Sequence, residues 1–460
     1  MNLSHITLLL VVLLASVFIY HRYLHPLAHV PGPASACMLP LFLYAIYYFG
    51  IENRVLLYYH TKYCAPVLRI APDVVALSDG EALHQVYFAG GSLSKDARHR
   101  NFCIEGHDTI FSALDQSYRD QRAKAVLPLF APSRIQAAYE RDAVTAPLIR
   151  KFVARLQEDK AKPNPKVDIL DLSSRLSIDY LTTYLFHLVY RGLDELPQSH
   201  HTHSADKKAN LLHWANKLSA TPFALTIVAF GRLSLLPNWL FTTIFSSLFA
   251  RAPSDAEISA SLHTVLQIAV DVLNTPDPGN DTYQSRIQAV GIARAESLVQ
   301  CKAAMFAGAD STAVMLTTVL FHLIRHPDVR ERLRAEIAQQ PAGGDTQPLP
   351  YLRAVIRASP ARLTRIVPLD SAGLTVSGYR LPPGTKVGAA AYVFHHNSAV
   401  YPQPFEFVPE RDAFPFGLGS GACLGRSLAN HQLRIVVKEV LESGILEGAR
   451  TCTDHIDIYE

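Results

Sequence analysis

Cysteine is scarce in this sequence, and the few cysteines present are far apart. The chain of 460 residues has six of them: Cys37, Cys64, Cys103, Cys301, Cys423 and Cys452. No two form a Cys-x-x-Cys pair, which argues against a structural zinc site and a disulfide scaffold and indicates a reducing compartment. Charge is also low and balanced: 18% of the residues are charged and the net charge is +3. We therefore predict no nucleic-acid partner.

The motifs of several large enzyme classes are missing as well. The sequence contains no Walker loop, no Gly-x-Ser-x-Gly elbow and no His-Glu-x-x-His pair, so the chemistry of those classes is not indicated. A tract rich in histidine, with His200, His201 and His203, has no cluster of carboxylates or cysteines beside it. A solvated loop is favoured over a metal site there. What the chain has in quantity is apolar residues, 49% of the total, as in a globular protein.

An uncharged apolar stretch of 18 residues lies near the start of the chain, from Leu3 to Tyr20. That length is near the minimum for crossing a hydrocarbon core of about 30 Å. His21 and Arg22 follow at once, and Tyr23 lies where a membrane interface would be. These features predict an N-terminal membrane anchor, residues 1–22, with the rest of the chain on the cytoplasmic side. A cleaved signal peptide is the alternative, but the stretch has no basic residue before it and no clear cleavage site after it.

Prolines follow the apolar stretch, in the segment HPLAHVPGP. They predict a stiff Pro-rich hinge, residues 23–34, that holds a single domain, residues 35–460, at a distance from the membrane. Within that domain, alternating β-branched residues predict two short strands over residues 66–79. A long apolar periodicity in residues 279–326 predicts a helix through the middle of the domain. A last helix is predicted over 424–442, and the fold class is mainly α with a small β part.

Glycines surround one of the six cysteines. Residues 414–429, FPFGLGSGACLGRSLA, place a tight, glycine-rich turn around Cys423 and start a helix directly after it. Glycines permit the unusual backbone dihedrals and the close approach of a flat ligand. Backbone N–H groups at the helix start can point at the sulfur and stabilise a thiolate. A glycine-rich turn around a buried free cysteine is the alternative.

The segment resembles the cysteine signature of the cytochrome P450 family, Phe-x-x-Gly-x-(Arg/His)-x-Cys-x-Gly. Phe416, Gly419, Cys423 and Gly425 match this pattern, while Gly421 stands where the family has a basic residue for a haem propionate. The resemblance implies a single P450-like catalytic domain and a haem b cofactor. It implies that Cys423 is the axial ligand of the iron and that the three matching residues belong to the cofactor-binding segment.

Two more segments resemble parts of the family that bind haem propionates. LDQSYRDQRAKAVLPLFAP resembles a helix in which Arg122 stands at the position of the propionate arginine, and Tyr118 replaces the usual Trp or His. LTRIVPLD resembles the strand that supplies another such arginine, here Arg365. For Arg122 considered alone, a solvated helix face is the alternative.

AGADST, residues 307–312, resembles the oxygen-binding motif of the family's central helix. Gly308 within a helix costs about 1 kcal/mol against alanine, and room for dioxygen beside the iron would compensate for that cost. Asp310 and Thr312 supply a carboxyl and a hydroxyl that can relay protons, which makes them the predicted catalytic residues. A packing groove made of small residues is the alternative.

The resemblance fails at several places. The family's Glu-x-x-Arg motif is missing where LPYLRAVIRASPARLTRIVP stands, and Pro360 would end the helix there. Glu331 and Arg334 have the motif's spacing, but in the preceding helix, where we interpret them as a surface charge pair. Arg411 of the Pro-Glu-Arg segment is thereby left without its usual partners, at a cost of several kcal/mol if it is buried.

The residues in these motifs resemble those of fungal microsomal P450s of secondary metabolism. This implies a monooxygenase that inserts one oxygen atom from dioxygen into an apolar small molecule. It also implies NADPH-cytochrome P450 reductase as the partner and the endoplasmic reticulum membrane as the location, with a single-pass anchor. The alternative is a non-catalytic or decayed P450-like protein, or an incomplete gene model, with weak or no haem binding.

Overall fold

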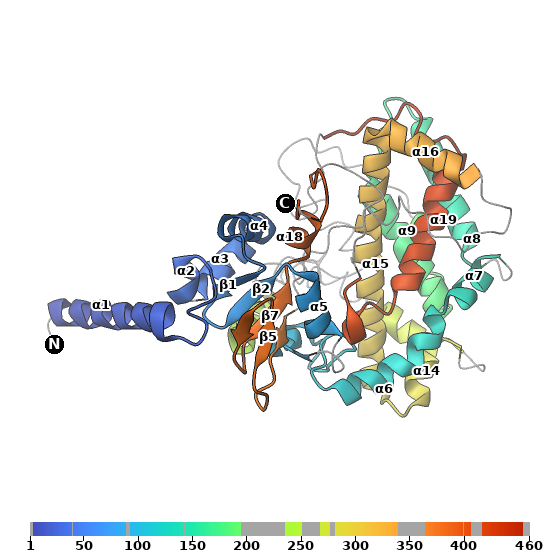
Figure 1. Cartoon of the computed structure of the whole chain (residues 1–460). Helices are drawn as coiled ribbons and strands as arrows, with labels where there is room; N and C mark the ends of the chain where they lie inside the picture. The colour runs from blue at the N-terminus through green and yellow to red at the C-terminus, as the bar shows by residue number, and fades with distance from the viewer. Residues whose placement is uncertain are drawn as a thin grey trace.

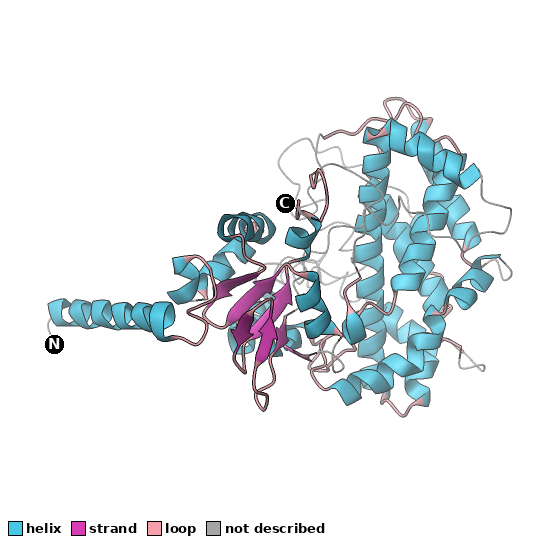
Figure 2. Ribbon diagram, in the orientation of Figure 1, coloured by secondary structure: helices cyan, strands magenta, loops and turns pink. Residues whose placement is uncertain are grey.

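A helical part and a smaller sheet part make up the body of the protein, and one helix projects from the sheet part (Figure 1). The computed structural model describes residues 3–38, 40–88, 93–140, 144–194, 235–250, 267–276, 281–338, 364–398, 400–405 and 416–453. The predicted sites at Pro360, Arg411 and the His-rich tract lie outside these residues. The larger helical part and the smaller sheet part agree with the predicted fold class, mainly α with a small β part (Figure 2).

The helical part is built around a long central helix, α15 (Arg294–Arg325). It packs most extensively on α9 (Ile169–Phe186), which is buried along most of its length, and also contacts α19 (Arg426–Glu442). The other helices of this part are α6 (Gln116–Val126), α7 (Pro132–Glu140), α8 (Ala146–Lys160), α14 (Tyr283–Ala289) and α16 (Pro327–Ala338), whereas α12 (Asn238–Ala250) contacts the 3-10 turn Ala97–Phe102 next to β3. The apolar faces of the helices in this part meet in the largest buried cluster, as amphipathic helices require.

The sheet part contains a five-stranded sheet in the order β1-β2-β7-β4-β3. Its strands are β1 (Val67–Ala71), β2 (Val74–Leu77), β3 (Ser94–Lys95), β4 (Arg365–Ile366) and β7 (Lys386–Ala389). β2 and β7 pair in parallel and the other neighbours are antiparallel. β5 (Leu374–Val376) and β6 (Tyr379–Leu381) form a separate hairpin. The sheet brings segments from the two ends of the chain together, beside the helix α5 (Gly80–Tyr87).

Several predicted elements are confirmed. The two strands over 66–79, the last helix and the Glu331–Arg334 pair, at 3.2 Å, are present. The predicted central helix is confirmed as α15, and the shorter helix α14 precedes it, separated by Gly291 with a left-handed φ of 82°. Residues 391–395 form the short helix α18 (Ala391–His395).

The proline-rich segment is packed against the sheet part and does not form an extended hinge. Leu27 and Val30 are buried in the core of the sheet part. Arg69 on β1 is fully buried. Its Nη1 donates to the carbonyl oxygen of His21 at 2.7 Å, and its backbone N–H donates to the carbonyl oxygen of Pro31, also at 2.7 Å. Gly32 passes so close that an added Cβ would overlap the Arg69 carbonyl. The segment is therefore part of the folded body.

The predicted membrane anchor corresponds to α1 (Leu3–Ile19), which leads into a π-helical turn at Tyr20–Leu24. Among the residues described, α15 is the helix long and apolar enough to cross a membrane, and 47% of its most apolar window is buried inside the protein. That burial makes α15 a core helix. α1 has 17 residues and exposes side chains such as Leu8 and Leu13 as it projects from the body (Figure 1). A membrane span at α1 stays a prediction.

Candidate haem-thiolate site

The turn around Cys423 is closed by its own backbone. The Cys423 N–H donates to the Phe416 carbonyl at 2.8 Å, and the Ala422 N–H donates to the Gly419 carbonyl at 3.1 Å. Gly417 and Gly419 have φ values of 71° and 63°, which favour glycine. The helix α19 then begins at Arg426. The loop fixes the cysteine three residues before the helix start.

The start of α19 lies next to Cys423, and the Arg426 N–H donates to the Cys423 carbonyl oxygen at 3.4 Å. Desolvation by the surrounding chain raises the pKa of the Cys423 thiol, while the neighbouring N–H groups of Gly425 and Arg426 and the positive charge of Arg426 act to lower that pKa. Stabilisation of a thiolate by these N–H groups stays a prediction. The residue is exposed at a cavity of about 330 Å³, which Arg119 of α6 also lines. Cys423 therefore lies between the start of a helix and an open cavity.

The glycines of the turn make room for protein atoms. A Cβ on Gly419 would overlap the backbone carbonyl of Tyr87 on α5, so this glycine lets the turn pack against that helix. A Cβ on Gly421 would overlap Nη2 of Arg365. A Cβ on Gly425 would lie 3.8 Å from the Cys423 sulfur. The close approach predicted for a flat ligand is made, at Gly419 and Gly421, by Tyr87 and Arg365.

Arg365 is 3% exposed and lies at the start of β4. Its Nε and Nη1 atoms have no hydrogen-bond partner among the described residues. The guanidinium carbon lies 5.6 Å from the centre of the Tyr87 ring. Burial and the neighbouring charge of Arg119 lower the pKa of Arg365. A buried cation with unpartnered donors, beside the Cys423 turn, fits the predicted role of binding a carboxylate.

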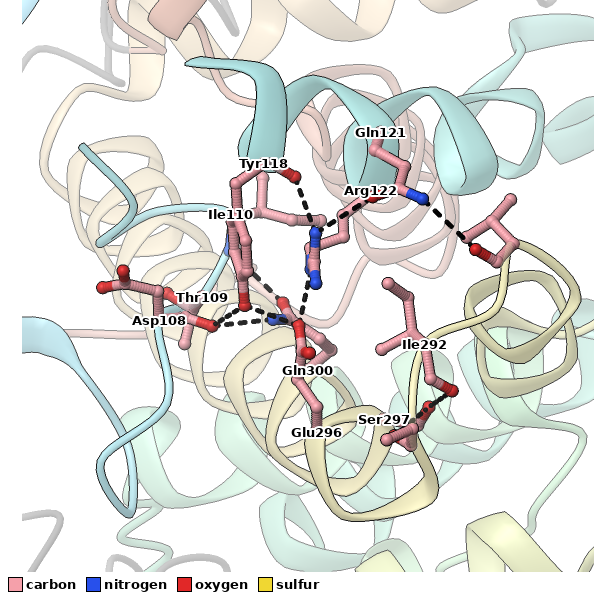
Figure 3. A network of polar contacts seen from close by, with 12 residues as sticks. Asp108, Thr109, Ile110, Tyr118, Gln121, Arg122, Ile292, Glu296, Ser297 and Gln300 are labelled. Atoms are coloured by element: carbon pink, nitrogen blue, oxygen red, sulfur yellow. Dashed lines mark hydrogen bonds and ion pairs between the residues drawn. The ribbon is translucent and has the colours of Figure 1, made fainter. Parts of the chain in front are cut away.

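Arg122, the other predicted propionate ligand, has a protein partner in this structure. Its Nε donates to Glu296 of α15 at 2.5 Å, and its guanidinium stacks on the Tyr118 ring at 3.3 Å (Figure 3). The Tyr118 hydroxyl lies 2.5 Å from the same carboxylate oxygen. Burial raises the pKa of Glu296, but hydrogen bonds from Arg122 and Tyr118 outweigh it and hold that pKa below its usual range. Arg122 thus ties α6 to α15, and its role toward a haem propionate stays a prediction.

The oxygen-motif residues lie on α15, and their side chains face different ways. Thr312 is 3% exposed, whereas Ser311 is exposed and its hydroxyl donates to the Ala307 carbonyl at 2.7 Å. The side chain of Asp310 lies outside the described part of the chain. The Ser311 hydroxyl is thus bonded within its own helix. The catalytic role of Asp310 and Thr312 stays a prediction.

Gly308 accommodates a neighbouring helix. A Cβ there would overlap Cδ1 of Leu181 on α9. The predicted room for dioxygen is thus filled by a leucine, and the groove of small residues, which was the alternative, is the one supported. α9 and α15 approach closely because of it.

Lys95 and Arg119 belong to this region and were missed in the sequence. Lys95 is the cross-strand partner of Arg365, and the charge of Arg119 acts on both. No local pattern marks Lys95, because its pairing joins strands that are far apart in the chain. Among the described residues there is no group of three or more His, Cys, Asp or Glu that could hold a metal.

Comparisons with known proteins agree with this arrangement. The family model for cytochrome P450 matches residues 31–443. The chain is 40% identical to the cytochrome P450 monooxygenase mfmF of Annulohypoxylon moriforme, covering 99% of this chain and 96% of that protein. It is 26% identical to the cytochrome P450 monooxygenase hkm5 of Aspergillus hancockii, covering 93% and 86%. The alignment with mfmF extends over 494 positions, more than the 460 residues of this chain, so that relative has residues which this chain lacks.

A solved structure shows the same fold. A zebra fish cytochrome P450, crystallised with abiraterone, matches with a TM-score of 0.58 at 17% identity, over 85% of this chain and 91% of that one. The fold, the cysteine turn and the match over most of the length lead to one assignment. The chain belongs to the cytochrome P450 monooxygenase family.

Proposed function

We propose that this chain binds haem b through Cys423 and inserts one oxygen atom from dioxygen into an apolar small molecule in fungal secondary metabolism. The observation that carries the proposal is the glycine-rich turn that presents Cys423 at a cavity, with the buried Arg365, whose Nε and Nη1 lack hydrogen-bond partners among the described residues, lying against the same turn. Thiolate ligation of haem iron favours O–O cleavage, which is the chemistry that the cofactor supplies when bound.

The residues present fit a haem on three counts. Cys423 is exposed at a cavity and is held by a turn that its own backbone closes. Arg365 has buried, unpartnered donors that suit a propionate. A lone thiolate suits an iron whose other ligands come from a porphyrin. These features support haem binding despite the absence of a basic residue at position 421.

The protein's own part in the reaction falls to α15. We propose Asp310 and Thr312 as the groups that relay protons, while the Ser311 hydroxyl between them donates to the Ala307 carbonyl within the helix. The buried apolar residues along α15 and α9 exclude water from the interface between these two helices. We propose that electrons come from NADPH-cytochrome P450 reductase and that α1 holds the protein at the endoplasmic reticulum membrane.

The test is the reduced-CO difference spectrum of the purified full chain, together with its haem content. We expect the band of a thiolate-ligated haem, with one haem per chain. Cys423→Ser should abolish that band, whereas Cys452→Ser, which removes another exposed cysteine, should leave it unchanged. A wild-type chain that shows no such band would refute the proposal and favour the non-catalytic alternative.

A further inference from the structure

Two cations face each other across the sheet at β3 and β4. Lys95 and Arg365 are direct partners in the antiparallel register, so their side chains lie on the same face. Like charges in directly opposite positions destabilise a sheet. Arg365 is buried and Lys95 is half-buried, which reduces screening by water. The pair is therefore costly unless an anion lies beside it.

Among the described residues, the carboxylates near this pair bind other groups. Asp96 is bound by Arg98 and by the Thr364 hydroxyl at 3.0 Å, and Asp120 accepts from Arg119 at 3.0 Å. Asp108 attracts Lys95 only through its charge. The Nζ atom of Lys95 itself donates to neutral carbonyl oxygens, including that of Phe111 at 2.7 Å.

Positive charge is thus in excess at this point of the fold. Burial, and then the charges of Arg365 and Arg119, lower the pKa of Lys95 to about 8. Arg119 is 8% exposed and also lines the cavity beside Cys423. Arg119 at the cavity and Arg365 against Gly421 therefore flank the Cys423 turn, and Lys95 is the strand partner of Arg365.

The glycine at position 421 explains how Arg365 reaches this place. An added Cβ at Gly421 would overlap Nη2 of Arg365, so a side chain at 421 and the Arg365 guanidinium compete for the same space. With Gly421 the guanidinium lies against the turn, two residues before Cys423. The missing basic side chain makes room for a cation from another strand.

We propose that Lys95, Arg119 and Arg365 form the binding site for the two haem carboxylates, with Gly421 making room for Arg365 and Lys95 supplying the charge that position 421 lacks. The inference rests on the proposed function, since it takes haem as the ligand. It assigns this role to Arg119 and leaves Arg122 to its ion pair with Glu296.

The first experiment measures haem release from the full chain to an excess of apomyoglobin. Lys95→Gln should accelerate release about tenfold, because a charge-assisted contact of more than 1 kcal/mol is lost. Gly421→Ala, which changes no charge, should also accelerate release by displacing Arg365. Lys124→Gln, a lysine lining the same cavity but outside the cluster, is the control and should match wild type. Added salt should reduce the difference in haem-release rate between Lys95→Gln and wild type, because salt screens the charge.

A second measurement separates charge from packing. Thermal unfolding of the full chain with and without haem should give opposite results for Lys95→Gln: a higher Tm without haem, since repulsion is relieved, and a lower Tm with haem. If Lys95 served only to hold the structure through its hydrogen bonds to the carbonyl oxygens, Lys95→Gln would lower the Tm both with and without haem. Release at the wild-type rate in Lys95→Gln and Gly421→Ala would overturn the inference while leaving the proposed function intact. A wild-type chain without haem would overturn both.

Discussion

At the scale of single residues, the pairing of Arg122 with Glu296 is the clearest case of a contact that the motif does not reveal. The sequence places Arg122 one turn after Tyr118, as the P450 propionate pattern requires. The carboxylate that binds it comes from α15, more than 170 positions later. Such a partner cannot be found from a motif, because the packing of two helices decides it. The role of the pair is therefore structural and can be tested by stability.

Glu296→Gln should lower the free energy of unfolding by about 2 kcal/mol, because a nearly buried arginine loses its charged partner. Urea denaturation followed by circular dichroism measures this change. Glu331→Gln, which breaks the exposed pair with Arg334 on α16, is the matched control and should cost less than about 0.5 kcal/mol. Equal effects of the two substitutions would contradict the structural role of Arg122.

At the scale of elements, the sequence predicted the features that depend on residues close together in the chain. The strands over 66–79, the helix after Cys423 and its N–H groups all follow from residues adjacent in sequence. The register of β3 on β4 does not, because Lys95 and Arg365 are far apart in the chain and each strand has two residues. The same applies to Gly308, whose neighbour Leu181 lies on another helix.

Gly308→Ala distinguishes close helix packing from room for a ligand. Alanine favours the helix by about 1 kcal/mol, but its methyl group would overlap Leu181 and separate α9 from α15. We expect a net destabilisation of about 1–2 kcal/mol, as for overpacked cores, measured by thermal or urea unfolding. The second substitution Leu181→Val, which removes the atom in conflict, should restore most of the loss. If Gly308→Ala stabilised the protein, the groove between α9 and α15 would have room for the added methyl group.

At the scale of the whole molecule, the boundary between the projecting helix and the folded body lies earlier than the prolines suggest. A hinge ending at residue 34 would leave the body intact if everything before it were removed. The structure puts Leu27 and Val30 in the sheet core and fixes His21 through the buried Arg69. The body therefore begins close to the π-helical turn at Tyr20–Leu24. α1 then leaves the body from a turn that Arg69 holds in place.

Two truncations test where the body begins. Removal of residues 1–19 should change the Tm of the protein by less than about 2 °C and should abolish its sedimentation with membranes, because α1 contributes exposed apolar side chains. Removal of residues 1–34 should lower the Tm by several degrees more, because burying Leu27 and Val30 is worth about 1.5–3 kcal/mol for each side chain. Both chains are compared at the same detergent concentration. Equal Tm values would show that the proline segment is a dispensable tether, and sedimentation of the shorter truncation would place membrane binding outside α1.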